Sequence, residues 1–448
     1  MSSQSIQNTQ IAMESLGIYR TLLKDPVISK LKILLEFVEN NPTNPIGILS
    51  TYNEFYHTLM EKGKGCSLKN YMIVKILFQD NIYARLVQNN IEIEPNNPIR
   101  LAAIEDLGSL YEIASIIPND IKNAIVNFES LMPILIDKFE NLPQWEENNL
   151  LGLQKEYDEI IQKFQNSLCW KERIDDLAYF HKENGSGMWA EFKGFVWEGE
   201  QLQGVLSLDP IRMDSLIGYE IERQKVIDNT LAFLDGYPAN NMLLYGGRGT
   251  GKSSTVKALL NEYYDKGLRI IEISKDHLST FPKVIRQIKD YPQKFILFID
   301  DLSFEDGKGA YTSLKAVLEG GLETRPSNVV IYATSNRRHL IKEKFSDRAG
   351  LSSVNASDEV RAADTMQEKL SLSDRFGITV TFTTPNQKQY LEIVEGLAKS
   401  RNIAIPKEDL YRKAIQWEMW YNARSPRTAT QFIDWLESQE DYRPQPNA

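Results

Sequence analysis

Several features that would narrow the function of this chain are scarce or missing from its sequence. Only two cysteines occur in 448 residues, Cys66 and Cys169, and neither has a His or another Cys nearby at the spacing of a metal site. We therefore expect buried, reduced thiols rather than a disulfide or a zinc site. No apolar run reaches the roughly 18 residues of a membrane span. Residues 1–14 are polar, without the basic start and apolar core of a secretory signal, so we expect a cytoplasmic protein with no membrane contact.

Positive charge is also in short supply. With 51 Lys and Arg against 61 Asp and Glu, the chain has a formal net charge of -10. This balance argues against broad electrostatic attachment to nucleic acid, although it leaves room for a local basic groove. Hydrophobic content of 42% and charged content of 25% are ordinary for a globular protein. Because single hydrophobic cores stop growing at roughly 250–300 residues, we expect about two or three domains.

A phosphate-binding pattern stands near the middle of the chain. It follows the apolar run Met242–Leu244, precedes a predicted helix at Thr255–Tyr264, and matches Gly-x4-Gly-Lys-Ser/Thr. In such a loop the glycines let backbone N–H groups converge on phosphates, Lys252 reaches the β/γ oxygens, and the hydroxyl of Ser253 can hold Mg²⁺. The pattern predicts a nucleoside triphosphate site. Its predicted binding residues are Gly246, Gly247, Arg248, Gly249, Thr250, Gly251, Lys252, Ser253 and Ser254.

Beyond this loop, apolar runs typical of buried strands alternate with helical patterns. Strands are predicted at Arg269–Ile273, Phe295–Ile299 and Val329–Ala333, and helices at Phe281–Ile288 and Tyr311–Leu318. This order predicts an α/β fold in which helices cover both faces of a parallel sheet.

Two carboxylates follow the strand at Phe295–Ile299. Asp300 and Asp301 are expected at the carboxyl edge of the sheet, where ligands bind in folds of this class. With a phosphate loop in the same chain, Asp300 is the expected holder of Mg²⁺. Asp301 is then the candidate to orient or deprotonate an attacking water.

The first 170 residues have a different texture. Apolar residues recur at three- and four-residue spacing over Val27–Phe37, Tyr52–Met60, Tyr71–Phe78, Leu101–Ile116 and Ala124–Phe139, which predicts an all-α N-terminal domain. These stripes indicate core packing, with a partner or substrate groove as the alternative. Around a polar turn at residues 198–200, apolar stretches predict a short β-hairpin.

The last part of the chain is predicted to be a helical lid. Thr384-Pro385-Asn386-Gln387 fits a capping box with proline at the first helical position, and an apolar face follows over residues 390–397. Ser425-Pro426 starts another predicted helix, with Arg427 in its first turn. A cation there is unfavourable by about 0.3–1 kcal/mol, so its placement indicates a compensating anion. The predicted divisions are residues 1–187 (helical domain), 188–207 (hairpin linker), 208–383 (α/β domain) and 384–448 (lid).

In this order the motifs resemble those of AAA+ ATPases, over about residues 208–440. The resemblance rests on the phosphate loop, Asp300-Asp301, Ala333–Asn336, Ser373–Phe376 and Ser425–Arg427. More narrowly, Gly-x-Arg-Gly-Thr-Gly-Lys-Ser-Ser and Tyr-Ala-Thr-Ser-Asn-Arg-Arg-His-Leu resemble the signatures of a bacterial AAA+ family with ATP-binding capacity, known as a domain of unknown function. The resemblance implies a P-loop AAA+ core with a parallel sheet and a helical lid.

The resemblance also implies roles for individual residues. Asn336 matches the polar sensor that contacts the γ-phosphate or the lytic water. Arg375 matches the arginine that similar ATPases project into a neighbouring subunit's nucleotide, an effect of about 10³–10⁵ in rate. Arg427 matches a lid residue that contacts bound phosphates, with Arg424 as the fallback. The segment containing Ile217-Gly218 resembles the one packed around adenine, which favours ATP; the sequence has no Asn-Lys-x-Asp guanine-reading motif.

Two departures from the family pattern leave alternatives open. Asp301 stands where such enzymes usually carry Glu, so that either Glu305 compensates or hydrolysis is slow. The polar stretch Lys342–Glu368 is either a loop gated by nucleotide or a disordered insertion. Separately, Arg337, Arg338 and Lys342 are either a basic cluster for DNA or exposed structural charges.

These observations together predict an ATP- and Mg²⁺-dependent AAA+ ATPase. We expect a homo-oligomer that remodels an unidentified partner bound through its helical N-terminal domain. A nucleotide-gated adaptor with little turnover is the alternative. A DNA-loading motor is a third reading, but it needs a DNA-binding module, and no helix-turn-helix signature is present.

Overall fold

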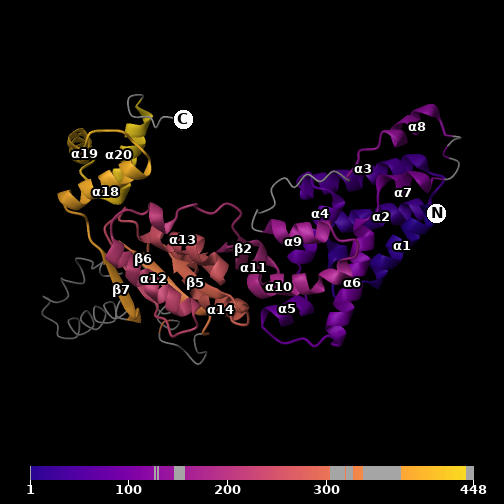
Figure 1. Cartoon of the computed structure of the whole chain (residues 1–448), viewed down its shortest axis with the longest axis horizontal. Helices are drawn as coiled ribbons and strands as arrows, with labels where there is room; N and C mark the ends of the chain where they lie inside the picture. The colour runs from indigo at the N-terminus through magenta and orange to yellow at the C-terminus, as the bar shows by residue number, and fades with distance from the viewer. Residues whose placement is uncertain are drawn as a thin grey trace, which may run out of the picture. The chain divides into compact units, whose positions relative to one another are not determined.

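The chain divides into two compact units, Met1–Glu191 and Phe192–Ala448, coloured from indigo to yellow along the sequence in Figure 1. Among the helices of the described ranges, none has both the length and the apolar character needed to cross a membrane. The computed structural model describes residues 2–125, 128, 131–145, 157–302, 318, 326–336 and 375–439.

Some predicted features lie outside the described residues, and the predictions made for them stay predictions. They are most of the helix predicted at Tyr311–Leu318, the polar stretch Lys342–Glu368, Glu305, Arg337, Arg338 and Ser373-Asp374.

In its described part, the first unit is built from helices, which confirms the predicted all-α N-terminal domain. Asp25, Asn44, Ser67 and Asn97 cap four of these helices by accepting backbone N–H groups of the first turn. Proline follows three of the caps, at the position where its missing N–H has no intrahelical acceptor to lose. The helices are α1 (Ser2–Ser15), η1 (Arg20–Lys24), α2 (Pro26–Asn40), α3 (Pro45–Lys62), α4 (Leu68–Leu77), α5 (Ile82–Gln88), α6 (Pro98–Ala114), α7 (Pro118–Asn123), α8 (Pro133–Glu140), α9 (Asp158–Gln165), η4 (Trp170–Arg173), α10 (Ile174–Asn184) and α11 (Met188–Glu191).

One stretch of helical apolar spacing in this unit, Ala124–Phe139, does not correspond to a single helix. Helix α7 ends at Asn123 and α8 begins at Pro133. Proline lacks an N–H and its ring clashes with the preceding turn, so Pro133 can begin a helix but not continue one. The apolar spacing runs across this break and conceals it.

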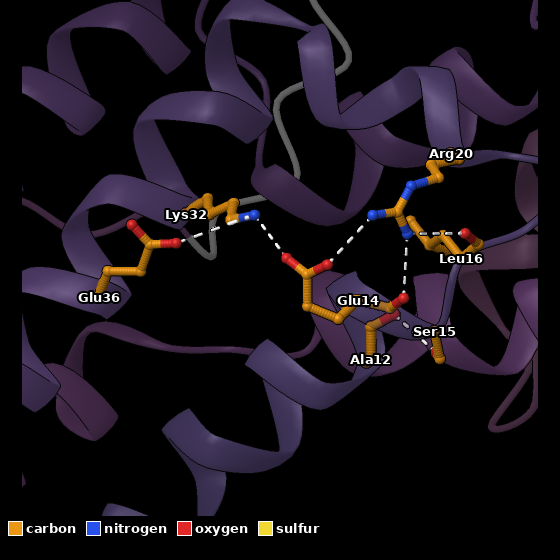
Figure 2. A network of polar contacts seen from close by, with 7 residues as sticks. All are labelled: Ala12, Glu14, Ser15, Leu16, Arg20, Lys32 and Glu36. Atoms are coloured by element: carbon orange, nitrogen blue, oxygen red, sulfur yellow. Dashed lines mark hydrogen bonds and ion pairs between the residues drawn. The ribbon is translucent and has the colours of Figure 1, made fainter.

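Polar contacts connect the first helix to its neighbours. The buried carboxylate of Asp106 in α6 accepts the backbone N–H of Gly17 at 3.0 Å and so holds the turn after α1. On the surface, Glu14 accepts hydrogen bonds from Lys32 of α2 at 2.5 Å and from Arg20 at 3.2 Å (Figure 2). The bond from Lys32, followed by that from Arg20, lowers the pKa of Glu14. Because exposed ion pairs contribute little to stability, Asp106 is the stronger of the two connections.

The second unit is organised around a seven-stranded sheet in its described residues, with helices beside it (Figure 1). The strand order is β2-β1-β4-β5-β6-β3-β7, and each neighbouring pair is parallel except β1 with β2. This confirms the predicted α/β class. The elements are β1 (Gly194–Glu198), β2 (Gln201–Gly204), η5 (Met213–Ser215), α12 (Glu220–Leu234), β3 (Met242–Gly246), α13 (Lys252–Tyr263), η6 (Tyr264–Lys266), β4 (Leu268–Ile273), η7 (Lys275–Thr280), α14 (Phe281–Ile288), β5 (Lys294–Ile299), β6 (Val329–Ser335), β7 (Ile378–Phe382), α18 (Gln387–Ser400), α19 (Lys407–Tyr421) and α20 (Pro426–Ser438).

The core of the sheet explains why its central strands are continuous apolar runs. Val226 of α12 and Val256 of α13 share one buried cluster with Leu244 of β3 and Phe298 of β5. All seven residues of β6 are buried, as expected for a parallel strand covered on both faces. This packing places the carboxyl ends of β5, β6 and β3 side by side.

The hairpin predicted between residues 188 and 207 is present as β1 and β2, after the short helix α11. Strand β1 pairs in parallel with β4, with Phe195 opposite Ile271, so the hairpin continues the sheet. The compact units divide between Glu191 and Phe192. The domain boundaries at 187/188, 207/208 and 383/384 stay predictions.

The three helices after β7 share a buried cluster and form the predicted lid, but the first of them starts two residues later than predicted. Asn386, not Thr384, is its N-cap: Asn386 accepts the N–H of Gln389 at 2.9 Å, and the Gln389 side chain accepts the N–H of Asn386 at 3.0 Å. The sequence fits a capping box at both positions. Thr384 lies against the phosphate loop instead, where a Cβ on Gly247 would come within 2.9 Å of its hydroxyl.

The two cysteines have different surroundings. Both are free; Cys66 is buried and Cys169 is half-buried. Burial raises the pKa of the Cys66 thiol to about 11. The predicted burial is therefore confirmed for Cys66, while Cys169 is more accessible than predicted.

A buried histidine near the end of α10 makes the first unit sensitive to acid. His181 is fully buried, its Nδ1 lies 3.1 Å from the carbonyl oxygen of Gly185, and its Nε2 has no hydrogen-bond partner among the described residues. Burial lowers the pKa of His181 to about 4, whereas in an unfolded chain a histidine titrates near pH 6.5.

We predict that the first unit loses stability as the pH falls from about 6.5 to about 4. The folded-state pKa lies below the unfolded one, so the contribution of neutral His181 is complete above pH 6.5 and declines by about 1.4 kcal/mol per pH unit below it. His181→Phe should flatten this dependence, and His57→Gln, at an exposed position, should leave it unchanged. Urea unfolding at pH 7 and pH 4.5 measures the effect. Equal pH dependence in the His181→Phe and unchanged proteins would contradict the prediction.

Candidate functional site

The phosphate loop connects β3 to α13 at the carboxyl edge of the sheet. Its glycines are required for two physical reasons. Gly249 and Gly251 have φ angles of 76° and 89°, in the left-handed region that glycine adopts without steric penalty. Gly246 has a φ of 153°, and a Cβ there would lie 1.9 Å from the backbone oxygen of Phe382 in β7. The loop thus depends both on backbone conformation and on the close approach of β7.

Lys252 begins α13 and is buried. Its ammonium donates to the carbonyl oxygens of Gly246 at 2.9 Å and Gly247 at 2.8 Å, and to Oδ1 of Asn336 at 3.0 Å. Burial lowers the pKa of Lys252, and the two carboxylates after β5 act in the opposite direction. The structure therefore places this cation beneath the loop and in contact with the end of β6.

Asp300 follows β5 and lies beside the first turn of α13. Its Oδ1 accepts three hydrogen bonds, from the hydroxyls of Ser253 and Thr334 at 2.6 Å each and from the N–H of Asp301 at 3.1 Å. No described residue donates to its Oδ2. The structure thus brings together the hydroxyl and the carboxylate that were predicted as a magnesium-holding pair, and both are oxygen ligands of the kind Mg²⁺ takes.

Asp301 turns the chain at the end of β5. Its φ is 51°, a left-handed conformation that costs a non-glycine residue about 1–3 kcal/mol. Its carboxylate accepts a hydrogen bond from Nδ2 of Asn336 at 2.6 Å. Because the same amide accepts from Lys252, three residues predicted as site residues form one continuous chain of hydrogen bonds.

The lid reaches the loop through the start of α20. Ser425 caps this helix, as predicted, and the backbone N–H of Arg427 donates to the carbonyl oxygen of Gly249 at 3.1 Å. Arg427 lies in the first turn with an exposed side chain that lines the cleft. Arg424, the fallback residue, donates instead to Glu418 of α19.

Loop and lid enclose a cleft of about 870 Å³, within the range of small-molecule sites. Its wall also includes Leu397 and Arg401 of α18, and Ile211 and Leu216 from the segment before α12. Leu216 directly precedes Ile217-Gly218, in the segment that resembles the one packed around adenine. The sequence did not predict the other wall residues, because helical spacing alone does not distinguish a cleft wall from a core face. Of the predicted phosphate-loop residues, the cleft is lined by Arg248, Gly249, Thr250, Gly251, Lys252, Ser253 and Ser254.

Two residues predicted to bind the base lie beside the lid core. A Cβ on Gly396 of α18 would come within 2.6 Å of Cγ2 of Ile217, and one on Gly218 would come within 3.0 Å of Ile393. Ile217 packs against the lid cluster, and the residue before it, Leu216, lines the cleft. The base-binding role of Ile217 and Gly218 stays a prediction.

Arg375 lies away from the phosphate loop of its own chain. It precedes β7, whereas Phe382 at the other end of this strand pairs with Gly246. A strand of five residues spans about 16 Å, which exceeds the reach of an arginine side chain. The structure therefore does not bring Arg375 together with the other predicted site residues.

The side chains of the cleft fit a nucleoside triphosphate with Mg²⁺. Lys252 supplies a buried cation, Arg248 and Arg427 are exposed cations on the same cleft, and Ser253 with Asp300 supplies hydroxyl and carboxylate oxygens. These cations suit a polyphosphate, whose oxygens form strong charge-assisted hydrogen bonds. Arg401 also lines the cleft, but it is paired with Asp434 and Glu437.

Comparison with known protein families shows the family to which the chain belongs. The family described as "Protein of unknown function (DUF815)" matches residues 190–440, more than half of the 448 residues. The chain belongs to this family. The match confirms the family resemblance that the sequence motifs indicated. Residues 190–440 include every residue of the candidate site described above.

Solved structures resemble the chain more remotely, and a search of curated proteins finds no match. A single-residue variant of RuvB from Thermotoga maritima has a TM-score of 0.32 and 15% identity, covering 52% of this chain and 74% of that chain. The RuvB Holliday junction branch migration motor of the same organism has a TM-score of 0.31 and 14% identity, with the same coverage of 52% and 74%.

In this DUF815 member, we predict that Gly246→Ala destabilises the second unit more than Gly251→Ala. A Cβ at Gly251 meets nothing within 4 Å, so that substitution costs about 1–2 kcal/mol for the left-handed backbone. At Gly246 the clash with the backbone of Phe382 adds about 1–3 kcal/mol of overpacking. Urea unfolding of the full chain compares the two variants, and equal midpoints would show that β7 does not press on the loop as described.

Proposed function

We propose that this chain is an AAA+ ATPase that uses ATP binding and hydrolysis to rearrange its lid and α/β core, and thereby to remodel a partner. The observation that carries the proposal is the hydrogen-bonded chain Lys252–Asn336–Asp301 beside the Ser253–Asp300 pair. It gathers in one cleft a cation for phosphate, two oxygens for a metal ion and a candidate base.

The proposed reaction assigns one task to each of these groups. Lys252 exchanges its carbonyl partners for the β- and γ-phosphate oxygens of ATP, and the glycine-rich loop directs N–H groups at the same oxygens. Ser253 and Asp300 hold the magnesium ion, which when bound neutralises charge on the β- and γ-phosphates. Asp301 orients the attacking water and accepts its proton, and the amide of Asn336 positions the γ-phosphate against that water.

The cleft also supports ATP as the nucleotide. Its lining includes the aliphatic residues Ile211, Leu216 and Leu397, which suit the apolar faces of a purine. The guanine-reading sequence Asn-Lys-x-Asp is absent from the 448 residues. We therefore assign ATP with Mg²⁺, and we place Ile217 and Gly218 behind the base, where they couple the cleft to the lid.

A second copy of the chain completes the proposed site. Because Arg375 is separated from its own loop by the length of β7, it serves the nucleotide of a neighbouring copy, while Arg427 contacts the phosphates from the lid of the same copy. Such an arginine contributes about 10³–10⁵ in rate. The proposed protein is thus a homo-oligomer, with its partner bound through the helical N-terminal unit.

A nucleotide-gated adaptor is the second candidate, favoured by one observation. Asp301 stands where Glu is usual, and its carboxylate is already engaged by Asn336. If this acid stays engaged when ATP is bound, the chain binds ATP, assembles and recruits its partner with little turnover. Steady-state ATP turnover with and without Arg375 separates the two candidates. No observation in the described residues supports nucleic acid as the partner.

We predict that Lys252→Ala abolishes or strongly weakens Mg-ATP binding and leaves the fold intact, because it removes the cation under the β- and γ-phosphates. Lys257→Ala, on the same helix, is the matched control and should bind as the unchanged chain does. Calorimetry measures both affinities, and circular dichroism checks the fold. If the Lys252→Ala protein bound ATP as tightly as the unchanged chain, the assignment of this cleft as the ATP site would be wrong.

We further predict that turnover depends on protein concentration and on Arg375. Arg375→Ala protein, which still binds ATP, and Lys252→Ala protein, which still supplies Arg375, should each be inactive, and their mixture should recover activity at mixed interfaces. Even the lower end of the expected effect, a loss of turnover of about 10³-fold, is large enough to measure above the assay background. Arg412→Ala, at an exposed lid arginine, is the control and should keep full turnover. Specific activity that is independent of dilution and tolerates Arg375→Ala would rule out the shared site.

A further inference from the structure

Thr334 lies at the centre of the site and has no part in the reaction proposed so far. It belongs to β6, the strand paired with β5, and is 2% exposed. We propose that Thr334 is a positioning residue that sets the orientation of both acids, Asp300 toward the metal and Asp301 toward the attacking water. This inference rests on the proposed function. Thr334 is part of the sequence motif Ala333–Asn336, but the sequence predicted a role only for Asn336.

Thr334 holds three successive residues beyond β5. Its hydroxyl donates to Oδ1 of Asp300 at 2.6 Å and accepts the N–H of Asp301 at 2.9 Å, and its carbonyl oxygen accepts the N–H of Leu302 at 2.7 Å. A threonine hydroxyl has a single proton, and here Asp300 receives it. The hydroxyl of Thr334 therefore contacts both acids, and its main-chain carbonyl holds the residue that follows them.

The bond to Asp300 controls which carboxylate oxygen faces the cleft. Oδ1 is shared between the hydroxyls of Thr334 and Ser253, which approach from β6 and from α13. A carboxylate held by two donors from different elements cannot rotate freely about its last bond, and Oδ2 stays free of described donors. Hydrogen bonds to an ionised acceptor are short and strong, so this constraint is a firm one.

The bond to Asp301 compensates for its unusual backbone. A left-handed aspartate at a φ of 51° costs about 1–3 kcal/mol, and its N–H is held in that turn by the hydroxyl of Thr334. The turn directs the short carboxylate to the amide of Asn336 at 2.6 Å. Thr334 thereby accounts for how an aspartate, one methylene shorter than the usual glutamate, reaches the sensor residue.

The test uses the full chain and measures ATP affinity by calorimetry, once with EDTA and once with Mg²⁺. Thr334→Val keeps the branched shape and removes both hydroxyl bonds. It should change the EDTA affinity by less than about twofold but reduce the Mg²⁺ enhancement by about tenfold, the effect of one hydrogen bond to a charged group. Thr334→Ser, which keeps the hydroxyl, should restore the enhancement. If Thr334→Val does not fold, Thr334→Ala, which leaves space rather than an apolar methyl, takes its place.

A matched control separates positioning from general stability. Thr230→Val removes another buried threonine hydroxyl, 2.9 Å from Tyr332 of the same strand, and should leave the Mg²⁺ enhancement unchanged. If Thr334→Val behaves like Thr230→Val, weakens both affinities equally, or is not rescued by serine, Thr334 has only a structural role. If the unchanged chain binds ATP under neither condition, the proposed function itself fails.

Discussion

The parallel pairing of β3, β5 and β6 is the constraint on which the candidate site depends. Parallel strands present their carboxyl ends at one edge, so that Lys252 and Asn336, 84 residues apart, lie within 3.0 Å of each other. Register matters as much as direction. A shift of β6 by one residue would turn Thr334 and Asn336 to the opposite face of the sheet and would separate them from both acids.

Much of the second unit could be predicted because its signals are local. The continuous apolar run of β5 needs burial on two faces, and α14 begins and ends at the predicted residues, Phe281 and Ile288. The phosphate loop is equally local, since a few neighbouring glycines and Lys252 suffice to define it. From strand order alone, Asp300 was then expected at the same edge, and the structure places it beside Ser253.

Other features depend on contacts that a single segment does not contain. The choice between Thr384 and Asn386 as the cap of α18 follows from the position of the phosphate loop, which the lid segment does not encode. The left-handed turn at Asp301 depends on Thr334 of a different strand. The lid wall of the cleft follows from how α18 packs against the core, and Pro133 interrupts a helical pattern that hydrophobic spacing alone would continue.

The hydrogen bonds of Lys252 have a consequence for the kinetics of the proposed nucleotide exchange. An ammonium has three protons, and each of them has an acceptor inside the protein, two loop carbonyls and the amide of Asn336. The protein therefore supplies this lysine with its own solvation shell. In the proposed reaction, phosphate oxygens would replace that shell one acceptor at a time, without stripping the cation to a bare charge in a buried site, where desolvation is costly. Arrival and departure of the proposed nucleotide would then differ by an exchange of acceptors, which would keep the reorganisation energy of both steps small.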